Sequence, residues 1–347
     1  MATTTEITTH PHPLLRRWRL AVNGCNVPEV ERADIVSRWL VIARACVFTM
    51  TFTSGLIGVL LAAEAGTGFG AFEIWLAALA VVGLVAAHAA NNLINDWTDV
   101  RSGVDTEDYP RAQYSKHPIL GGLTTQNGLL KAALVLNLID AAIMAYFVAV
   151  RGPLVIAFAV GGLALSLAYT GTLKRIGLGE ITALVVWGPL MIGGTVFVVS
   201  GQLTPGLWLA TLPYGLIVAS VLVGKHIDKR EVDAPLHVRS VPVLLGERAA
   251  LALNKAAFVV FYLLVISLVA LRITGPWILL TFLALPRLRT VWKVYSEPKP
   301  AEPPAEWTVW PLWYVGWAMY FNRQAGEFFV LGLLLNVVVP QIAGLLT

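Results

Sequence analysis

The chain has 347 residues, of which 57% are hydrophobic and 13% are charged, and its mean hydropathy is +0.71. Soluble domains carry about 25% charged residues, so this composition excludes a water-soluble fold and predicts that most of the chain lies in lipid. The net charge of +4 does not indicate a nucleic-acid partner, because the basic residues fall in short segments between apolar runs, as membrane orientation requires.

The first 37 residues contain no apolar run long enough to cross a bilayer or to act as a secretory signal. They carry Arg16, Arg17 and Arg19, so residues 1–37 are interpreted as a cytoplasmic N-terminal arm. Cys25 and Cys46 have no metal-ligand spacing and are too few for a disulfide framework, so both are expected to be inert.

Apolar runs that suit transmembrane helices of about 20 residues recur along the rest of the chain. They lack the alternation of barrel strands, so the sequence predicts an all-α polytopic membrane protein, a bundle of nine helices. The expected spans are residues 38–62, 71–94, 128–149, 153–170, 180–200, 206–225, 250–271, 275–292 and 326–346. The first eight form a transmembrane core over residues 38–292, and residues 326–347 form the final helix.

The predicted loops differ strongly in charge. Nearly all basic residues fall in loops on one side of the bundle, whereas the other side has only Arg151 and Arg272. The positive-inside rule then places the N-terminus in the cytoplasm and, after nine crossings, the C-terminus outside.

Residues 293–325 separate the core from the last span. The stretch SEPKPAEPP at 296–304 is proline-rich and is expected to be an extended spacer. Aromatic residues follow at intervals of mostly three or four residues, which favours a helix in the headgroup layer. They are Trp307, Trp310, Trp313, Tyr314 and Trp317.

A first acidic cluster, NNLINDWTDVRSGVD at 91–105, follows the second span. Asn95 and Asp99 are four residues apart and share a helix face, and Asp105 lies just beyond, so their oxygens are predicted to hold Mg²⁺. An ordinary solvated helix end is the alternative, but polar residues at a membrane edge are functional candidates by default. Asp96 is interpreted either as a residue that supports the metal ligands from behind or as a helix cap.

A second acidic cluster, KHIDKREVD at 225–233, follows the sixth span. Asp228 and Glu231 are three residues apart and are expected to share a face, whereas Asp233 would need the helix to loosen near its end. The alternative is a charged loop balanced by Lys229 and Arg230. Two acidic clusters on one membrane side indicate a pair of metal sites, both facing the cytoplasm.

These motifs resemble the UbiA superfamily of intramembrane prenyltransferases, and within it the 1,4-dihydroxy-2-naphthoate polyprenyltransferases of menaquinone synthesis. The resemblance rests on NDWTDVRSGVD at 95–105, AYTGTLKRIGLGE at 168–180, GPLMIGGT at 188–195, HIDKREVD at 226–233 and RSVPVLLGER at 239–248. It implies a bundle with a central cavity open to lipid, in the plasma membrane of a prokaryote. The partners implied are a polyprenyl diphosphate, a small acceptor and the bilayer, with Mg²⁺ as cofactor.

The resemblance also implies roles for particular residues. Asp99 and Asp228 would be catalytic, holding Mg²⁺ on the diphosphate. The metal ligands would be Asn95, Asp99, Asp105, Asp228 and Asp233. The resemblance places Arg44, Lys174 and Arg175 at the substrate. The residues themselves add Asn92, Asp96, Tyr169, Glu231 and Arg239 as predicted substrate contacts.

The implied reaction is transfer of a polyprenyl group to an aromatic acceptor. A metal and basic side chains would stabilise the diphosphate leaving group, and an apolar cavity would keep water from the allylic cation. Two alternatives stay open at this stage: a non-aromatic or porphyrin-like acceptor, and a non-catalytic lipid-binding or transport protein. The sequence does not indicate the prenyl length or the oligomeric state.

Overall fold

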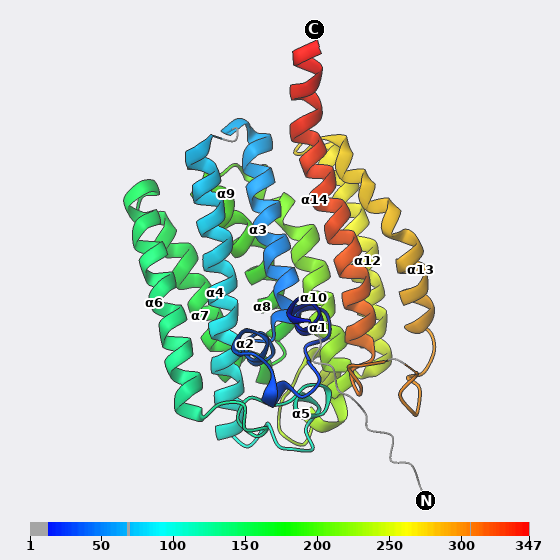
Figure 1. Cartoon of the computed structure of the whole chain (residues 1–347). Helices are drawn as coiled ribbons and strands as arrows, with labels where there is room; N and C mark the ends of the chain where they lie inside the picture. Colours follow the sequence, from blue (N-terminus) through cyan, green and yellow to red (C-terminus); the bar gives the residue numbers. More distant parts are fainter. Residues whose placement is uncertain (1–12, 68–69, 306, 347) are drawn as a thin grey trace, which may run out of the picture.

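The computed structural model describes residues 13–67, 70–305 and 307–346. Long helices lie side by side along a common direction, and the described residues contain no strand (Figure 1). The α-helices are α1 (Leu14–Gly24), α2 (Ile35–Ile42), α3 (Phe48–Ala62), α4 (Ala71–Arg101), α5 (Pro110–Tyr114), α6 (Gln126–Arg151), α7 (Leu154–Gly171), α8 (Gly179–Val185), α9 (Met191–Ser200), α10 (Pro205–Asp233), α11 (Val241–Leu245), α12 (Glu247–Ala270), α13 (Leu285–Val294) and α14 (Tyr314–Leu346). Short 3-10 or π-helical segments are η1 (Val30–Arg32), η2 (Ala45–Val47), η3 (Ala63–Thr67), η4 (Leu173–Arg175), η5 (Val186–Leu190) and η6 (Pro276–Ala284). The predicted all-helical membrane fold is confirmed.

Seven helical stretches within the described residues are long and apolar enough to cross a bilayer. They are Ala45–Thr67, Ala71–Arg101, Gln126–Arg151, Gly179–Ser200, Pro205–Asp233, Glu247–Ala270 and Tyr314–Ile342. A shorter apolar helix covers Leu154–Tyr169, and the predicted span at 275–292 is divided into η6 and α13. α7 and α13 both lie alongside the longer helices (Figure 1), and the number of nine crossings stays a prediction.

The predicted N-terminal arm contains helical structure from residue 14 onward, and residues 1–12 lie outside the described residues. α1 packs against α2 and η2 at the end of the bundle that also holds α5, whereas the last turns of α14 project from the opposite end (Figure 1). The chain reverses through η1 and α2, and this reversal brings Cys25 and Cys46 together. The two cysteines, expected to be inert, are joined in a disulfide with Cα atoms 5.0 Å apart.

The main core lies among α3, α9, α10, α12 and α14, and Tyr214, Phe258 and Phe321 are among its fully buried side chains. α10 is enclosed by its neighbours: 67% of its most apolar 18-residue window is buried, against 11% for α6. Gly224 of α10 permits a close approach of the start of α14, because a Cβ there would lie 3.0 Å from the carbonyl oxygen of Tyr314.

The aromatic segment does not form a separate interfacial helix, contrary to the sequence expectation. α14 begins at Tyr314 and continues without a break into the final span. The rings of Trp307, Trp313 and Trp317 instead pack against one another, with centroids 4.6 to 5.7 Å apart. Trp307 and Trp317 also line the central cavity, because the segment folds back over the bundle.

Candidate active site

The first acidic cluster lies on the last turns of α4. The helix continues beyond the predicted span end at residue 94 to Arg101, so Asn95 and Asp99 are one turn apart on one face. Beyond the helix end, the carbonyl oxygen of Asp99 accepts the amides of Val104 and Asp105 at 2.9 and 3.1 Å. This turn brings Asp105 back beside Asp99, as the predicted metal motif requires.

Arg44 lies at a break between α2 and η2 rather than within a continuous span. Its φ is +58°, in the left-handed region that costs a non-glycine residue roughly 1–3 kcal/mol. Asn92 holds the same break, because its side-chain amide donates to the carbonyl oxygen of Ala43 at 3.0 Å. The predicted span at 38–62 is therefore interrupted, and the interruption directs Arg44 toward α4.

Asp96 is completely buried and accepts hydrogen bonds from two arginines. Asp96 Oδ1 accepts from Arg44 Nη2 and from Arg111 Nε, the latter at 3.3 Å, and Asp96 Oδ2 accepts from Arg111 Nη2 at 3.1 Å. A carboxylate paired in this way holds the two guanidinium groups in place. Asp96 is thus a support for the site rather than one of its lining residues.

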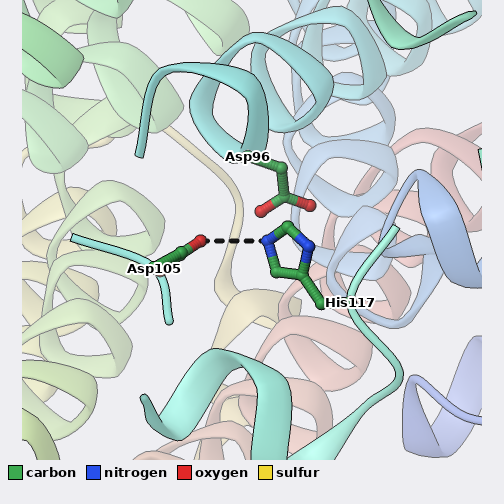
Figure 2. Close-up of side chains that lie close together, drawn as sticks. All are labelled: Asp96, Asp105 and His117. Carbon is green, nitrogen blue, oxygen red and sulfur yellow. Dashed lines mark hydrogen bonds and ion pairs between the residues drawn. The ribbon is translucent and has the colours of Figure 1, made fainter. Parts of the chain in front are cut away.

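His117, from the loop after α5, holds Asp105 from the other side (Figure 2). His117 Nδ1 accepts the amides of Ile119 and Leu120, so the ring proton is on Nε2, which donates to Asp105 Oδ2 at 3.2 Å. Burial lowers the pKa of His117, and the charges of nearby arginines add to this, so the ring is neutral. Burial alone would raise the pKa of Asp105, but the hydrogen bond from His117 and the charges of Arg44 and Lys229 hold it below its usual range.

Asp96, Asp105 and His117 bring potential ligand atoms within 4.8 Å of one another. These three do not suit a metal ion as a set, because Asp96 is paired with two arginines and His117 Nε2 carries a proton. Their arrangement fixes the position of Asp105 and leaves its carboxylate charged.

Lys174 comes from η4 and reaches the same place. Its Nζ donates to Asp99 Oδ1 at 2.7 Å, and both side chains are buried. The neighbouring Arg175 is exposed, since the next residue on this short turn points away from the bundle. The structure thus separates two residues for which the sequence predicted one role.

α10 contributes Lys225, Lys229 and Asp233, which are spaced four residues apart on one face. Asp233 Oδ1 accepts a hydrogen bond from the Tyr109 hydroxyl at 2.6 Å and lies 3.7 Å from Lys229 Nζ. His226, on the same side, is oriented by Glu180, whose Oε1 lies 2.7 Å from His226 Nδ1. Asp233 needs no loosening of the helix, because α10 is regular to its end.

Asp228 does not join these residues, which corrects its predicted role as a catalytic acid and metal ligand. Its two carboxylate oxygens accept the amides of Tyr314 and Val315, each at 3.0 Å, and Lys299 Nζ lies 3.7 Å away. These are the first amides of α14, so Asp228 caps that helix. The physical reason is helical rotation: neighbours such as Asp228 and Lys229 point about 100° apart.

Glu231 and Arg239 also lie apart from the site, contrary to prediction. The side chain of Glu231 is 87% exposed and contacts Arg230, and Arg239 is exposed in the loop after α10. Asp228 and Glu231 therefore share no metal site with the first cluster.

The remaining residues enclose a small polar pocket, and several of them also line a much larger cavity. The polar pocket is lined by Arg44, Asn95, Asp99, Val104, Asp105, Tyr109, Arg111, Tyr114, Tyr169, Lys174, Lys225, His226, Lys229, Asp233, Val238 and Leu312. The apolar cavity has a volume of about 1270 Å³ and is lined mainly by α4, α6, α7, α9, α14 and the aromatic segment. Both include Arg44, Asn95, Tyr169 and Lys225, so the pocket and the cavity lie next to each other and share part of their lining, and Asn92 lines the cavity.

The oxygen donors of the pocket suit Mg²⁺. Carboxylate and amide oxygens are the ligands that this ion prefers. Among the described residues, Asn95 Oδ1 and Asp233 Oδ2 are buried without a hydrogen-bond partner. A buried oxygen of this kind costs free energy unless something binds it, and a cation beside Asp99 and Asp105 would do so.

Comparisons with known proteins identify the family of this chain. The sequence profile of the UbiA prenyltransferase family matches residues 51–315. The chain belongs to the UbiA prenyltransferase family. As a member of that family it is a prenyltransferase, and the predicted family is confirmed.

Individual relatives are distant. A curated relative from Bacillus subtilis, named 1,4-dihydroxy-2-naphthoate octaprenyltransferase, is 22% identical over 245 residues, which cover 68% of this chain and 76% of the relative. A solved structure of a UbiA homologue from Aeropyrum pernix has a TM-score of 0.62 at 20% identity and covers 83% of this chain and 97% of its own. Another, from Archaeoglobus fulgidus with bound GPP and Mg²⁺, has a TM-score of 0.54 at 11% identity over 84% and 99% of the two chains. These structures share the fold with this chain.

The sequence reasoning did not select Tyr109, Arg111, His117, Lys225 and Lys229, all of which lie in or beside the polar pocket. The loop residues carried no spacing signal, because their positions depend on how the loop folds back. The two lysines did carry one: together with Asp233 they repeat every four residues, the spacing of a single helix face.

Proposed function

We propose that the protein is an Mg²⁺-dependent transferase that moves a polyprenyl group from its diphosphate to an aromatic acceptor. The acceptor proposed is 1,4-dihydroxy-2-naphthoate or a related quinone precursor, and diphosphate is released. The observation that carries the proposal is a cation-rich, acid-bearing pocket that shares part of its lining with an apolar cavity of about 1270 Å³. A prenyl diphosphate fits both, because its charged head suits the polar pocket and its apolar tail suits the cavity.

The residues of the pocket have separate roles in this proposal. Asn95, Asp99, Asp105 and Asp233 would hold Mg²⁺, which supplies Lewis-acid stabilisation of the leaving group when bound. Lys174 neutralises Asp99 and, with the arginines held by Asp96, faces the diphosphate.

The apolar cavity has a separate task in the same reaction. It excludes water from the carbon that loses the diphosphate until the acceptor attacks. Tyr169 lines both the pocket and the cavity and places its ring where the positive charge develops.

The proposed orientation puts the polar pocket at the cytoplasmic face of a prokaryotic plasma membrane, with the C-terminus outside. It is supported by the concentration of basic residues at the pocket end, whereas Arg151 ends α6 at the other end. Cysteine-accessibility labelling of single cysteines placed at positions 107 and 272 in intact cells tests it. Labelling of position 107 from outside the cell would overturn it.

The proposal is tested by an acceptor screen. Detergent-purified protein is incubated with Mg²⁺, a prenyl diphosphate and a panel of aromatic, porphyrin-like and glycerol-lipid acceptors, and the products are identified by mass spectrometry. A prenylated naphthoate that disappears with EDTA and returns with Mg²⁺ is the expected result. Transfer to a non-aromatic acceptor alone would overturn the acceptor class, and turnover in EDTA would overturn the metal requirement.

A further inference from the structure

The end of α10 presents ammonium groups where a second metal site would need carboxylates. The face toward the polar pocket carries Lys225, Lys229 and Asp233, and Asp228 is bound to the start of α14. The α10 face therefore offers a single carboxylate to the pocket. That carboxylate, Asp233, already accepts a hydrogen bond from Tyr109 and lies 3.7 Å from Lys229 Nζ.

The net charge of the pocket also disfavours a second divalent cation. Its described lining includes five cationic side chains, Arg44, Arg111, Lys174, Lys225 and Lys229, and three carboxylates, Asp99, Asp105 and Asp233. This is an excess of two positive charges before any ion binds, although buried Asp96 behind the pocket offsets one of them. A second divalent cation on the α10 side would lie close to two ammonium groups, and like charges at short range repel strongly in a buried site.

We propose that Lys225 and Lys229 neutralise the substrate diphosphate in place of a second Mg²⁺, so that the enzyme works with one divalent cation. The inference rests on the proposed function and adds to it the metal stoichiometry and two substrate-binding residues. Two lysines carry the same charge as one Mg²⁺. The single ion is held between the α4-side residues Asn95, Asp99 and Asp105 and the one carboxylate of α10, Asp233.

The two lysines have different positions relative to the bond that breaks. Lys225 lines both the polar pocket and the apolar cavity, so it lies at the junction of diphosphate head and prenyl tail. Among the described residues no carboxylate forms an ion pair with Lys225, which leaves its charge free for an anion. Lys229 lies deeper, over the ring of Tyr109 at 4.4 Å, and faces the far phosphate.

The transfer breaks one bond of the prenyl diphosphate and forms one bond to the acceptor. The bond between the first prenyl carbon and the bridging oxygen breaks, and its electron pair stays on the diphosphate. Lys225 stabilises the negative charge that develops on that oxygen. The acceptor carbon forms the new bond and loses its proton to an oxygen of the released diphosphate.

The direct test counts metal ions on the intact wild-type protein. Purified protein is saturated with geranyl thiolodiphosphate, an analogue that resists ionisation, and titrated with Mn²⁺ while free Mn²⁺ is measured by electron paramagnetic resonance. One tightly bound Mn²⁺ per chain is expected, and two would overturn the inference. If the analogue itself fails to bind, the proposed function fails, which is a separate outcome from a count of two.

A double variant tests the two lysines directly. Combining Lys225→Asn with Lys229→Asp puts an amide oxygen and a carboxylate at the two positions, and we expect this variant to bind a second Mn²⁺ in the presence of the analogue. The single variant Lys225→Ala is expected to weaken analogue binding about tenfold while the count stays at one. Lys131→Asp, on the exposed start of α6, is the matched control and should change neither quantity. Unchanged analogue affinity in Lys225→Ala, in protein that elutes and melts as the wild type, would overturn the role of Lys225.

Discussion

The ends of α4 and α10 have similar sequences, but different kinds of side chain from each helix enter the polar pocket. Each helix carries an apolar span into an acidic cluster on the same side of the bundle. On α4, Asn95 and Asp99 enter the polar pocket, and Asp96, on the adjacent face, holds two arginines. On α10, the first acid caps another helix, and lysines take the positions that face the pocket. An acidic motif therefore predicts a metal site only when the rotation of its helix is known.

The largest effect on turnover is expected at Asp99, on the α4 side of the polar pocket. Asp99→Asn keeps the volume of the side chain but removes the charge that we propose binds the cation, and we expect turnover to fall by about 10³-fold. Initial rates with saturating prenyl diphosphate measure the loss. Glu107→Gln, exposed in the following loop, is the control and should retain wild-type rates. Full turnover of Asp99→Asn would remove α4 from the metal site.

The support beneath the α4 site can be tested through stability. Asp96→Asn leaves Arg44 and Arg111 buried with one counter-charge fewer, which should cost about 3 kcal/mol of unfolding free energy. Thermal unfolding in one detergent gives the comparison with wild type. Adding Arg111→Met to Asp96→Asn should recover part of the loss. No loss in the single variant would mean that the ion pairs do not hold the site.

Separate asparagine substitutions at the two α10 aspartates, Asp233 and Asp228, test the difference between them. Asp233→Asn should lower turnover at least about tenfold with little change in melting temperature, because Asp233 faces the pocket. Asp228→Asn should keep turnover within about twofold but destabilise the fold by about 1–2 kcal/mol, because it weakens the cap of α14. Rates and melting curves on the same preparations separate the two effects. The reverse pattern would restore Asp228 to the active site.

The smallest effects are expected at the predicted site residues that the structure leaves exposed. Arg175→Gln, Glu231→Gln and Arg239→Gln should each stay within about twofold of wild-type turnover and binding, since exposed charges away from the pocket contribute little. Titration of prenyl diphosphate against each variant provides the measurement. A large rise in KM for Arg239→Gln would place the loop after α10 over the substrate.

Much of the candidate site could be predicted from the first motif. Asn95, Asp99 and Asp105 are close in sequence, so helical spacing and one turn bring them together wherever α4 packs. Lys174 was found through its motif, but its difference from Arg175 was not, since two adjacent residues on a short turn point in different directions and the sequence does not say which is inward. His117 and Arg111 were beyond prediction because a loop between helices set their positions.

The sequence by itself determined that this protein is an all-helical membrane protein with an acidic motif at the end of α4, because apolar run length and i to i+4 spacing are properties of the local chain. The resemblance of its motifs to a known family indicated a prenyltransferase. The tertiary structure decided which face of α10 enters the pocket. α10 is apolar nearly all round until Lys225 and is enclosed by α8, α12 and α14, so its hydrophobic pattern does not fix its rotation. The close contact of Gly224 with the start of α14 and the cap formed by Asp228 fix that rotation, and both depend on residues about 90 positions away.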